Sequence, residues 1–196
     1  MSKQGVKRVR WRPVLAVLAV LACSMFASNA FGDDAGFRVL DGDISLIDDV
    51  YYLNTRVDYQ LSDAAREAMH SGLPLTFELQ IEVERPRPWI WNQSVASLSQ
   101  RYRLRYHDLS GRYILTNLNS GESRSFAFES AVLQAVGTVD ALPLIDRRLL
   151  DEGEVYEVRV RARLDVNGLP QPLRAIAMVS RQWRLASEWV SWRLQV

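Results

Sequence analysis

The sequence predicts an all-β protein, an antiparallel β-sandwich of roughly eight strands with two short helices. Three segments carry this prediction because apolar and polar residues alternate in them, and a period of two places each set on its own face of a strand. These segments are residues 75–84, 101–106 and 156–164. Their polar positions are mostly charged, which is typical of a sheet with one face in water.

Turn residues between β-rich segments predict two antiparallel units. Residues 37–47 and 50–61 are rich in Val, Ile and Tyr and flank the dipeptide Asp48-Asp49, which predicts a first hairpin. Glycine-containing turns divide residues 100–128 into three further strands, so we expect a meander there.

Two segments have helix signals instead. Ser62 suits the N-cap of a short helix over residues 63–71. A second helical stretch is expected over residues 129–136, ending at Gly137. Neither is long enough to be stable alone, so both are expected to pack against the sheets.

The N-terminus resembles an export signal. Five basic residues within the first 12 positions precede an apolar run over residues 14–27. A run of 14 residues is shorter than the roughly 20 that a spanning helix needs. Ser28 and Ala30 are the small residues that a signal peptidase reads, so residues 1–30 are expected to be a cleaved signal peptide.

Export implies a single periplasmic β-sandwich domain, residues 31–196. An inner-membrane anchor over residues 13–31 is the first alternative, and a lipoprotein attached through Cys23 is the second. The exported part has 19 basic and 23 acidic side chains, a net charge of −4, so no general affinity for nucleic acid or anionic lipid is expected. It contains no cysteine and therefore no disulfide.

Two rows of arginines are the most regular charged feature. One strand carries Arg101, Arg103 and Arg105, and another carries Arg159, Arg161 and Arg163. Such rows can bind an anionic polymer, because the guanidinium group pairs bidentately with phosphate and carboxylate. A cross-strand ladder with the glutamates of residues 78–84 is the favoured interpretation, since like charges placed opposite each other destabilise a sheet.

Tryptophans supply the second candidate surface. Trp183, Trp189 and Trp192 are expected in the core, because tryptophan is highly buried on average. The Pro-rich loop at residues 86–91 is the best located contact site, where rigid prolines present a cation and aromatic anchors. Its candidate binding residues are Arg87, Trp89 and Trp91.

The inventory for catalysis is poor, so no catalytic residue, metal or cofactor is assigned. His70 and His107 lack metal-ligand spacing, and the exported part has no thiol and no nucleophile motif. The preferred function is non-enzymatic binding of an envelope protein or a small envelope ligand. A hydrolase of envelope polymers with an assembled carboxylate pair is the alternative.

Several short motifs, in this order, resemble a family of uncharacterised exported proteins of Gram-negative bacteria, a domain of unknown function. The motifs are Leu53–Arg56 on a strand, Leu73-Pro74-Leu75 entering the long alternating strand, Trp89 after prolines, Tyr102–Tyr106 before His107-Asp108, and Trp183-Arg184-Leu185 followed by Ser187, Trp189 and Trp192. The resemblance covers about Phe37 to Leu194. The resemblance implies an envelope location and, because genes of this family tend to lie beside one for a nitrogen-regulator-like sensor histidine kinase, such a kinase as a candidate signalling partner.

We predict that the chain is exported and cut between Ala30 and Phe31. N-terminal sequencing of the periplasmic protein should begin at Phe31, because the two small residues before it fit the peptidase. A membrane-bound product that still begins near Met1 would contradict cleavage. A lipid on Cys23 would favour the lipoprotein instead.

Overall fold

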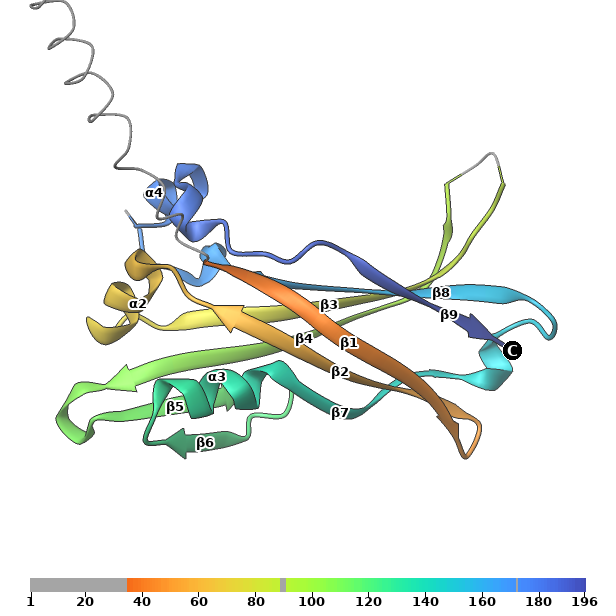
Figure 1. Cartoon of the computed structure of the whole chain (residues 1–196), viewed down its shortest axis with the longest axis horizontal. Coiled ribbons are helices and arrows are strands. Elements are labelled where there is room, and N and C mark those ends of the chain that lie inside the picture. Colours follow the sequence, from red (N-terminus) through yellow and green to blue (C-terminus); the bar gives the residue numbers. More distant parts are fainter. Residues whose placement is uncertain (1–34, 89–90, 172) are drawn as a thin grey trace, which may run out of the picture. The chain divides into compact units, whose positions relative to one another are not determined.

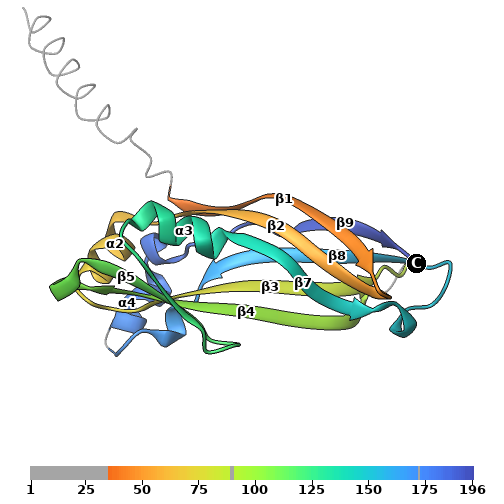
Figure 2. The same cartoon turned by 90° about the horizontal axis from the view of Figure 1, so that it is seen from below.

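The structure is a computed structural model that describes residues 35–88, 91–171 and 173–196, and its strands form two antiparallel sheets (Figure 1). The smaller sheet has the strand order β1 (Gly36–Ile47), β2 (Val50–Gln60), β7 (Thr138–Asp146). The larger has the order β6 (Ser123–Phe126), β5 (Arg112–Asn117), β4 (Gln93–His107), β3 (Leu75–Arg85), β8 (Val155–Leu164), β9 (Val190–Gln195). Figure 2 shows the sheets as two layers.

The core lies between these two layers and is centred on β3. Phe77 of β3 contacts the rings of Phe37 on β1 and Tyr59 on β2, with ring centroids 5.9 and 5.1 Å apart. Alternate side chains of β3 and β8 are buried beside these rings, as the period of two predicts. They include Leu79, Ile81, Val83, Val158 and Val160. The predicted sandwich is therefore confirmed.

A two-residue turn joins β1 to β2. Asp48 and Asp49 both have positive φ, 49° and 64°. A tight hairpin turn of this kind needs positive φ at both central positions, and aspartate tolerates it better than most residues. The predicted first hairpin is thus confirmed, with Ile47 paired to Val50.

Helix α2 (Asp63–His70) starts where the sequence predicts. The Ser62 hydroxyl accepts a hydrogen bond from the backbone N–H of Ala65 at 3.2 Å and donates one to the carbonyl of Gln182 at 2.6 Å. The first bond caps the helix. The second connects it to the 3-10 helix η4 (Arg181–Trp183), which is far away in sequence but in contact in the fold. Ala65 and Met69 are its buried residues.

Helix α3 (Glu129–Gly137) packs beside β2 where the pairing of β2 with β7 ends. Its last residue, Gly137, lies so close to β2 that an added Cβ would be 2.1 Å from the carbonyl oxygen of Val57. Only glycine fits there. The predicted helix over residues 129–136 is confirmed, with Gly137 as its final residue.

The described residues also contain elements that the sequence prediction missed. There are nine strands rather than about eight, and a third helix, α4 (Leu173–Val179), follows β8. Strand β7 was not expected from the sequence, because Pro143 and the positive φ of Ala141 interrupt any regular alternation. It lies at the edge of the smaller sheet, where a proline is tolerated. Strand β4 begins at Gln93, before residue 100, where the meander was expected to begin. The other 3-10 helices are η1 (Asp108–Ser110), η2 (Arg147–Leu149) and η3 (Val166–Gly168).

Replacing Leu79 with Ala is expected to lower the free energy of unfolding by about 2 to 5 kcal/mol, because the buried side chain leaves a cavity. Replacing Glu82 with Ala on the opposite face should cost under about 1 kcal/mol, since its ion pair with Arg159 is partly exposed. Urea unfolding of both variants measures the difference. Equal, small losses would mean that the buried face of β3 is misplaced.

Replacing Gly137 with Ala should destabilise the fold by about 2 kcal/mol or more, because the new methyl group collides with a backbone carbonyl that cannot move alone. Gly36→Ala is the matched control, since a Cβ there meets nothing within 4 Å. The control should change the free energy of unfolding by less than about 0.5 kcal/mol. Similar melting temperatures for both variants would show that α3 can shift away from β2.

Candidate functional site

The tip of the β3–β4 hairpin presents the most exposed tryptophan of the described chain. Trp91 is 91% exposed, and Pro86, Arg87 and Pro88 beside it are also exposed. Figure 1 shows the tip standing clear of the neighbouring strand β8. Trp89, the other predicted anchor, lies outside the described residues. The prolines sit in the turn and not within a paired strand, as predicted.

Side-chain contacts hold the base of this tip. Arg87 donates a hydrogen bond to Gln93, and the Asn92 amide donates one to Glu84 at 2.9 Å. This Asn92 bond, followed by Arg159, lowers the pKa of Glu84 below its ordinary value. The carboxylate therefore stays ionised and keeps its two partners. Ion pairs from Arg85 to the β7–β8 connection fix the end of β3, with Asp151 at 2.8 Å and Glu154 at 2.6 Å.

On the outer face of the larger sheet, two arginines of β8 form part of the predicted cross-strand ladder with glutamates of β3. Arg163 contacts Glu78 through its Nε at 2.6 Å, and Arg159 lies 3.7 Å from Glu82 and 3.2 Å from Glu84. These pairs neutralise the three glutamates of β3 on this face. The ladder, rather than an open row of cations, is the arrangement on β8.

Arg101 departs from the simple ladder. It stands opposite Glu78 in the β3–β4 register, yet it pairs with the buried Asp165 at 3.0 Å. Glu78 is already occupied by Arg163 and by the Ser99 hydroxyl, which donates a hydrogen bond at 2.8 Å. Competition between two arginines for one glutamate thus sends Arg101 to another carboxylate.

Arg103 and Arg105 are exposed, and neither has an ion pair with another described residue. Arg103 stands opposite Thr76 and Thr116, and Ile114 stands opposite Arg105. They remain available to an anion. They are not part of the hairpin tip, however, because the 12 residue-to-residue steps along β4 from Gln93 to Arg105 span roughly 40 Å. The predicted binding residues therefore divide into two separate places.

The expectation that all three C-terminal tryptophans lie in the core is wrong for Trp189. Trp183 is buried and Trp192 packs against the core. Trp189 is half-buried on the outer face, where the guanidinium groups of Arg159 and Arg161 lie 4.7 and 5.9 Å from its ring centroid. It is three residues before Trp192, and an odd spacing on extended chain gives opposite faces. The odd spacing between Trp189 and Trp192 in the sequence could therefore have predicted that only one of them faces the core.

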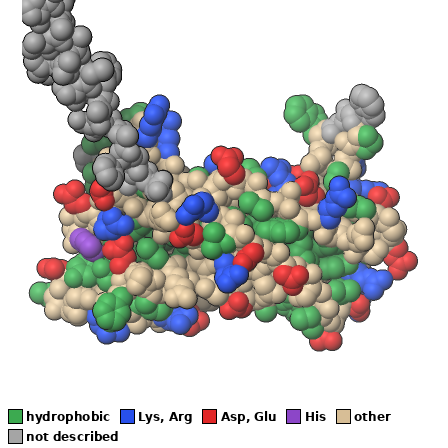
Figure 3. Space-filling model, viewed as in Figure 1, with side chains coloured by type: hydrophobic (Ala, Val, Ile, Leu, Met, Phe, Trp, Pro, Cys, Tyr) green, Lys and Arg blue, Asp and Glu red, His purple; other side chains and the backbone are tan. Residues whose placement is uncertain are grey.

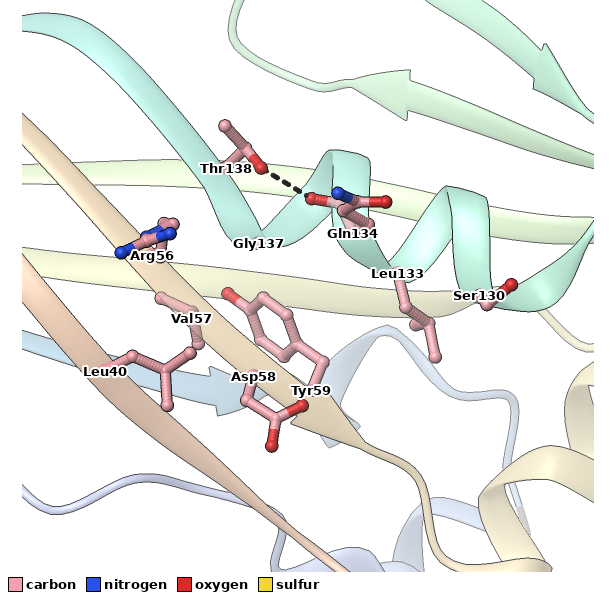
Figure 4. A pocket seen from close by; sticks show the side chains of 10 residues that line it. All are labelled: Leu40, Arg56, Val57, Asp58, Tyr59, Ser130, Leu133, Gln134, Gly137 and Thr138. Carbon is pink, nitrogen blue, oxygen red and sulfur yellow. Dashed lines mark hydrogen bonds between the residues drawn. The ribbon is translucent and has the colours of Figure 1, made fainter.

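A shallow pocket of about 400 Å³ lies on the smaller sheet, between β1, β2 and α3 (Figure 4). Leu40 and Leu133 supply its apolar wall. Arg56 and Asp58 line it but already have partners, since Arg56 binds Asp41 and Asp58 accepts from Arg38 and Gln60. No sequence signal pointed to this pocket, because it depends on how α3 meets the sheet.

Asp41, Glu84 and both histidines are engaged in local contacts. The hydrogen bond from Arg56 lowers the pKa of Asp41, and the pKa of Glu84 is lowered as well. Both shifts run opposite to what a general acid needs. His70 contacts the Tyr113 hydroxyl at 3.1 Å, and His107 contacts Ser110 within one exposed turn.

Two further searches cover only the part of the chain that the structure describes. There, no three His, Cys, Asp or Glu side chains come together as metal ligands. No helix among these residues has the length and apolar character to cross a membrane.

Comparison with known proteins identifies a family but no characterised relative. A family model described as a domain of unknown function, DUF4390, matches residues 34–193. No curated protein and no solved structure matches the chain. The family match confirms the resemblance to a domain of unknown function that the sequence motifs indicated. Because it covers most of the sequence, the chain belongs to the DUF4390 family.

Proposed function

We propose that the protein is a non-enzymatic binding domain of the bacterial cell envelope and that the β3–β4 hairpin tip makes the contact. The exposure of Trp91 is the observation that carries this proposal. A large aromatic ring that is 91% exposed loses much unfavourable contact with water when a partner covers it.

The hairpin tip is also suited to binding with little loss of entropy. Pro86 and Pro88 restrict the backbone, and the contacts of Arg87 and Asn92 with the strand ends hold the turn. Aromatic and arginine side chains contribute most of the energy in many interfaces. A partner with an apolar pocket and a neighbouring carboxylate would match Trp91 and Arg87. In Figure 3, by contrast, acidic and basic side chains are interspersed over the visible face of the fold.

The envelope location rests on the N-terminal export signal. A periplasmic protein released after Ala30 meets envelope proteins and small envelope ligands, and a sensor histidine kinase is the partner that the family resemblance implies. Retention through residues 13–31 or lipidation at Cys23 would keep the same domain attached to a membrane. The hydrolase alternative receives less support, because the pKa of Asp41 is lowered where a general acid needs it raised.

Replacing Trp91 with Ala should reduce the recovery of a specific crosslinked partner from envelope fractions by at least about tenfold, the loss expected of an aromatic anchor. The melting temperature should not change, since the exposed ring supports no core contact. Leu109→Ala is the matched control, because that side chain is 95% exposed in η1 at the other end of β4.

Two outcomes would overturn the assignment of this site. Equal recovery of the partner by the Trp91 and Leu109 variants would remove the hairpin tip from the contact. A large fall in the melting temperature of the Trp91 variant would show that the ring serves the fold. Arg87→Ala tests the cation separately and should weaken recovery less than the loss of the ring.

A further inference from the structure

Helix α4 exposes apolar side chains that no other part of the described chain covers. Ile176, Met178 and Val179 are 56%, 50% and 73% exposed, whereas Ala177 between them is buried and holds the helix to the fold. Exposed apolar side chains are common when single, but three within four residues form a patch that favours a partner or a membrane.

Basic residues border this patch without acidic ones among them. Residues 166–187 contain Arg174, Arg181 and Arg184 and no aspartate or glutamate. Arg181 and Arg184 are exposed, and Arg184 reaches back to the carbonyl of Met178 at 3.3 Å. An apolar patch with arginines at its rim matches the chemistry of a bilayer with anionic lipids, where apolar side chains enter the acyl boundary and guanidinium groups bind phosphates.

The neighbouring part of the larger sheet extends the basic surface. Gly168 of η3 lies against β3, since a Cβ added to it would be 3.3 Å from the Thr76 hydroxyl. Thr76 is paired with Arg103 on the neighbouring strand β4. Arg103 is exposed and has no ion pair with a described residue. The one acidic side chain at this junction, Asp165, is buried against Arg101.

One of the two acidic residues of the helix on the other side of the patch, Asp63, is also paired. Helix α2 packs against η4 and begins with Asp63. The Asp63 carboxylate lies 3.1 Å from the Arg66 guanidinium, so its charge is partly neutralised.

The course of the chain places this surface where the fold begins. Gly36 at the start of β1 pairs with Gln60, and Ser62 just after it contacts Gln182 in η4. Figures 1 and 2 both show the start of β1 and α4 at the same end. If residues 13–31 remain in the membrane, the five steps from Phe31 to Gly36 reach at most about 18 Å. That end then lies next to the bilayer surface.

We propose that α4 and its flanking arginines form a surface that binds an anionic lipid bilayer. A second copy of the chain is a poorer fit, because a stable interface buries about 800 Å² on each partner and a seven-residue helix offers far less. Three apolar side chains give weak, reversible attachment. The arginines or an N-terminal tether must therefore add to it.

Polarity-sensitive fluorophores on the full chain test this surface. With Cys23 replaced by Ser, single cysteines are introduced as Ile176→Cys and, for control, Leu149→Cys. Leu149 is also exposed, at 71%, but lies in η2, before the start of β8, whereas α4 follows the end of β8. The protein is reconstituted in vesicles of equal parts phosphatidylglycerol and phosphatidylcholine, or of phosphatidylcholine alone.

We expect a blue shift of the label at position 176 in the phosphatidylglycerol vesicles and none at position 149. Changing Arg181 and Arg184 to Gln should weaken the attachment about twenty-fivefold, since each arginine near an anionic surface adds about fivefold. Trp91→Ala should leave the shift unchanged, so failure of the hairpin contact and failure of this inference are separable.

Three outcomes would overturn the inference. The label at position 176 could remain in water in both kinds of vesicle. The shift could be the same at positions 176 and 149, which would reflect only the tether. It could also appear without vesicles and grow with protein concentration, which would assign α4 to contact between copies of the chain.

Discussion

The alternation along β3 is the constraint on which the rest of the structure depends. This strand pairs with β4 on one side and β8 on the other, so its side chains set both faces of the larger sheet. Its odd-numbered residues from Leu75 to Val83 are buried, and the even-numbered Glu78, Glu82 and Glu84 meet arginines on the outer face. A shift of register by one residue would turn the glutamates toward the core and the apolar side chains toward the outer face, so the register is strongly specified.

This division leaves little of either sheet face free for binding. One face of the larger sheet is covered by the smaller sheet, and on the other face the glutamates of β3 are paired with arginines of β8. The unpaired features lie at the ends of the strands, where the chain leaves the regular sheet. Trp91 stands at one end, and α4 with Arg103 stands at the other. Loops and irregular segments on a rigid scaffold are common places for function.

The sequence predicted what depends on neighbouring residues and missed what depends on register and packing. The hairpin at Asp48-Asp49, the Ser62 cap and the buried parity of β3 each follow from a few adjacent residues. The pairing of Arg101 with Asp165 follows from competition for Glu78 across three strands, which no local pattern contains. Helix α4 was missed because a proline-rich segment precedes it and its seven residues show no capping signal.

The two proposed surfaces are related by the length of β3. Thr76 lies beside η3 at the α4 end and Arg85 leads into the hairpin tip, so the two ends are separated by nine residues of extended chain, roughly 30 Å. That distance exceeds the Debye length of about 8 Å at physiological ionic strength. Charge at a membrane bound by α4 would therefore be screened at the tip. With α4 on a bilayer, Trp91 would stand away from it, where a partner in the aqueous phase could reach the ring without competing for the lipid surface.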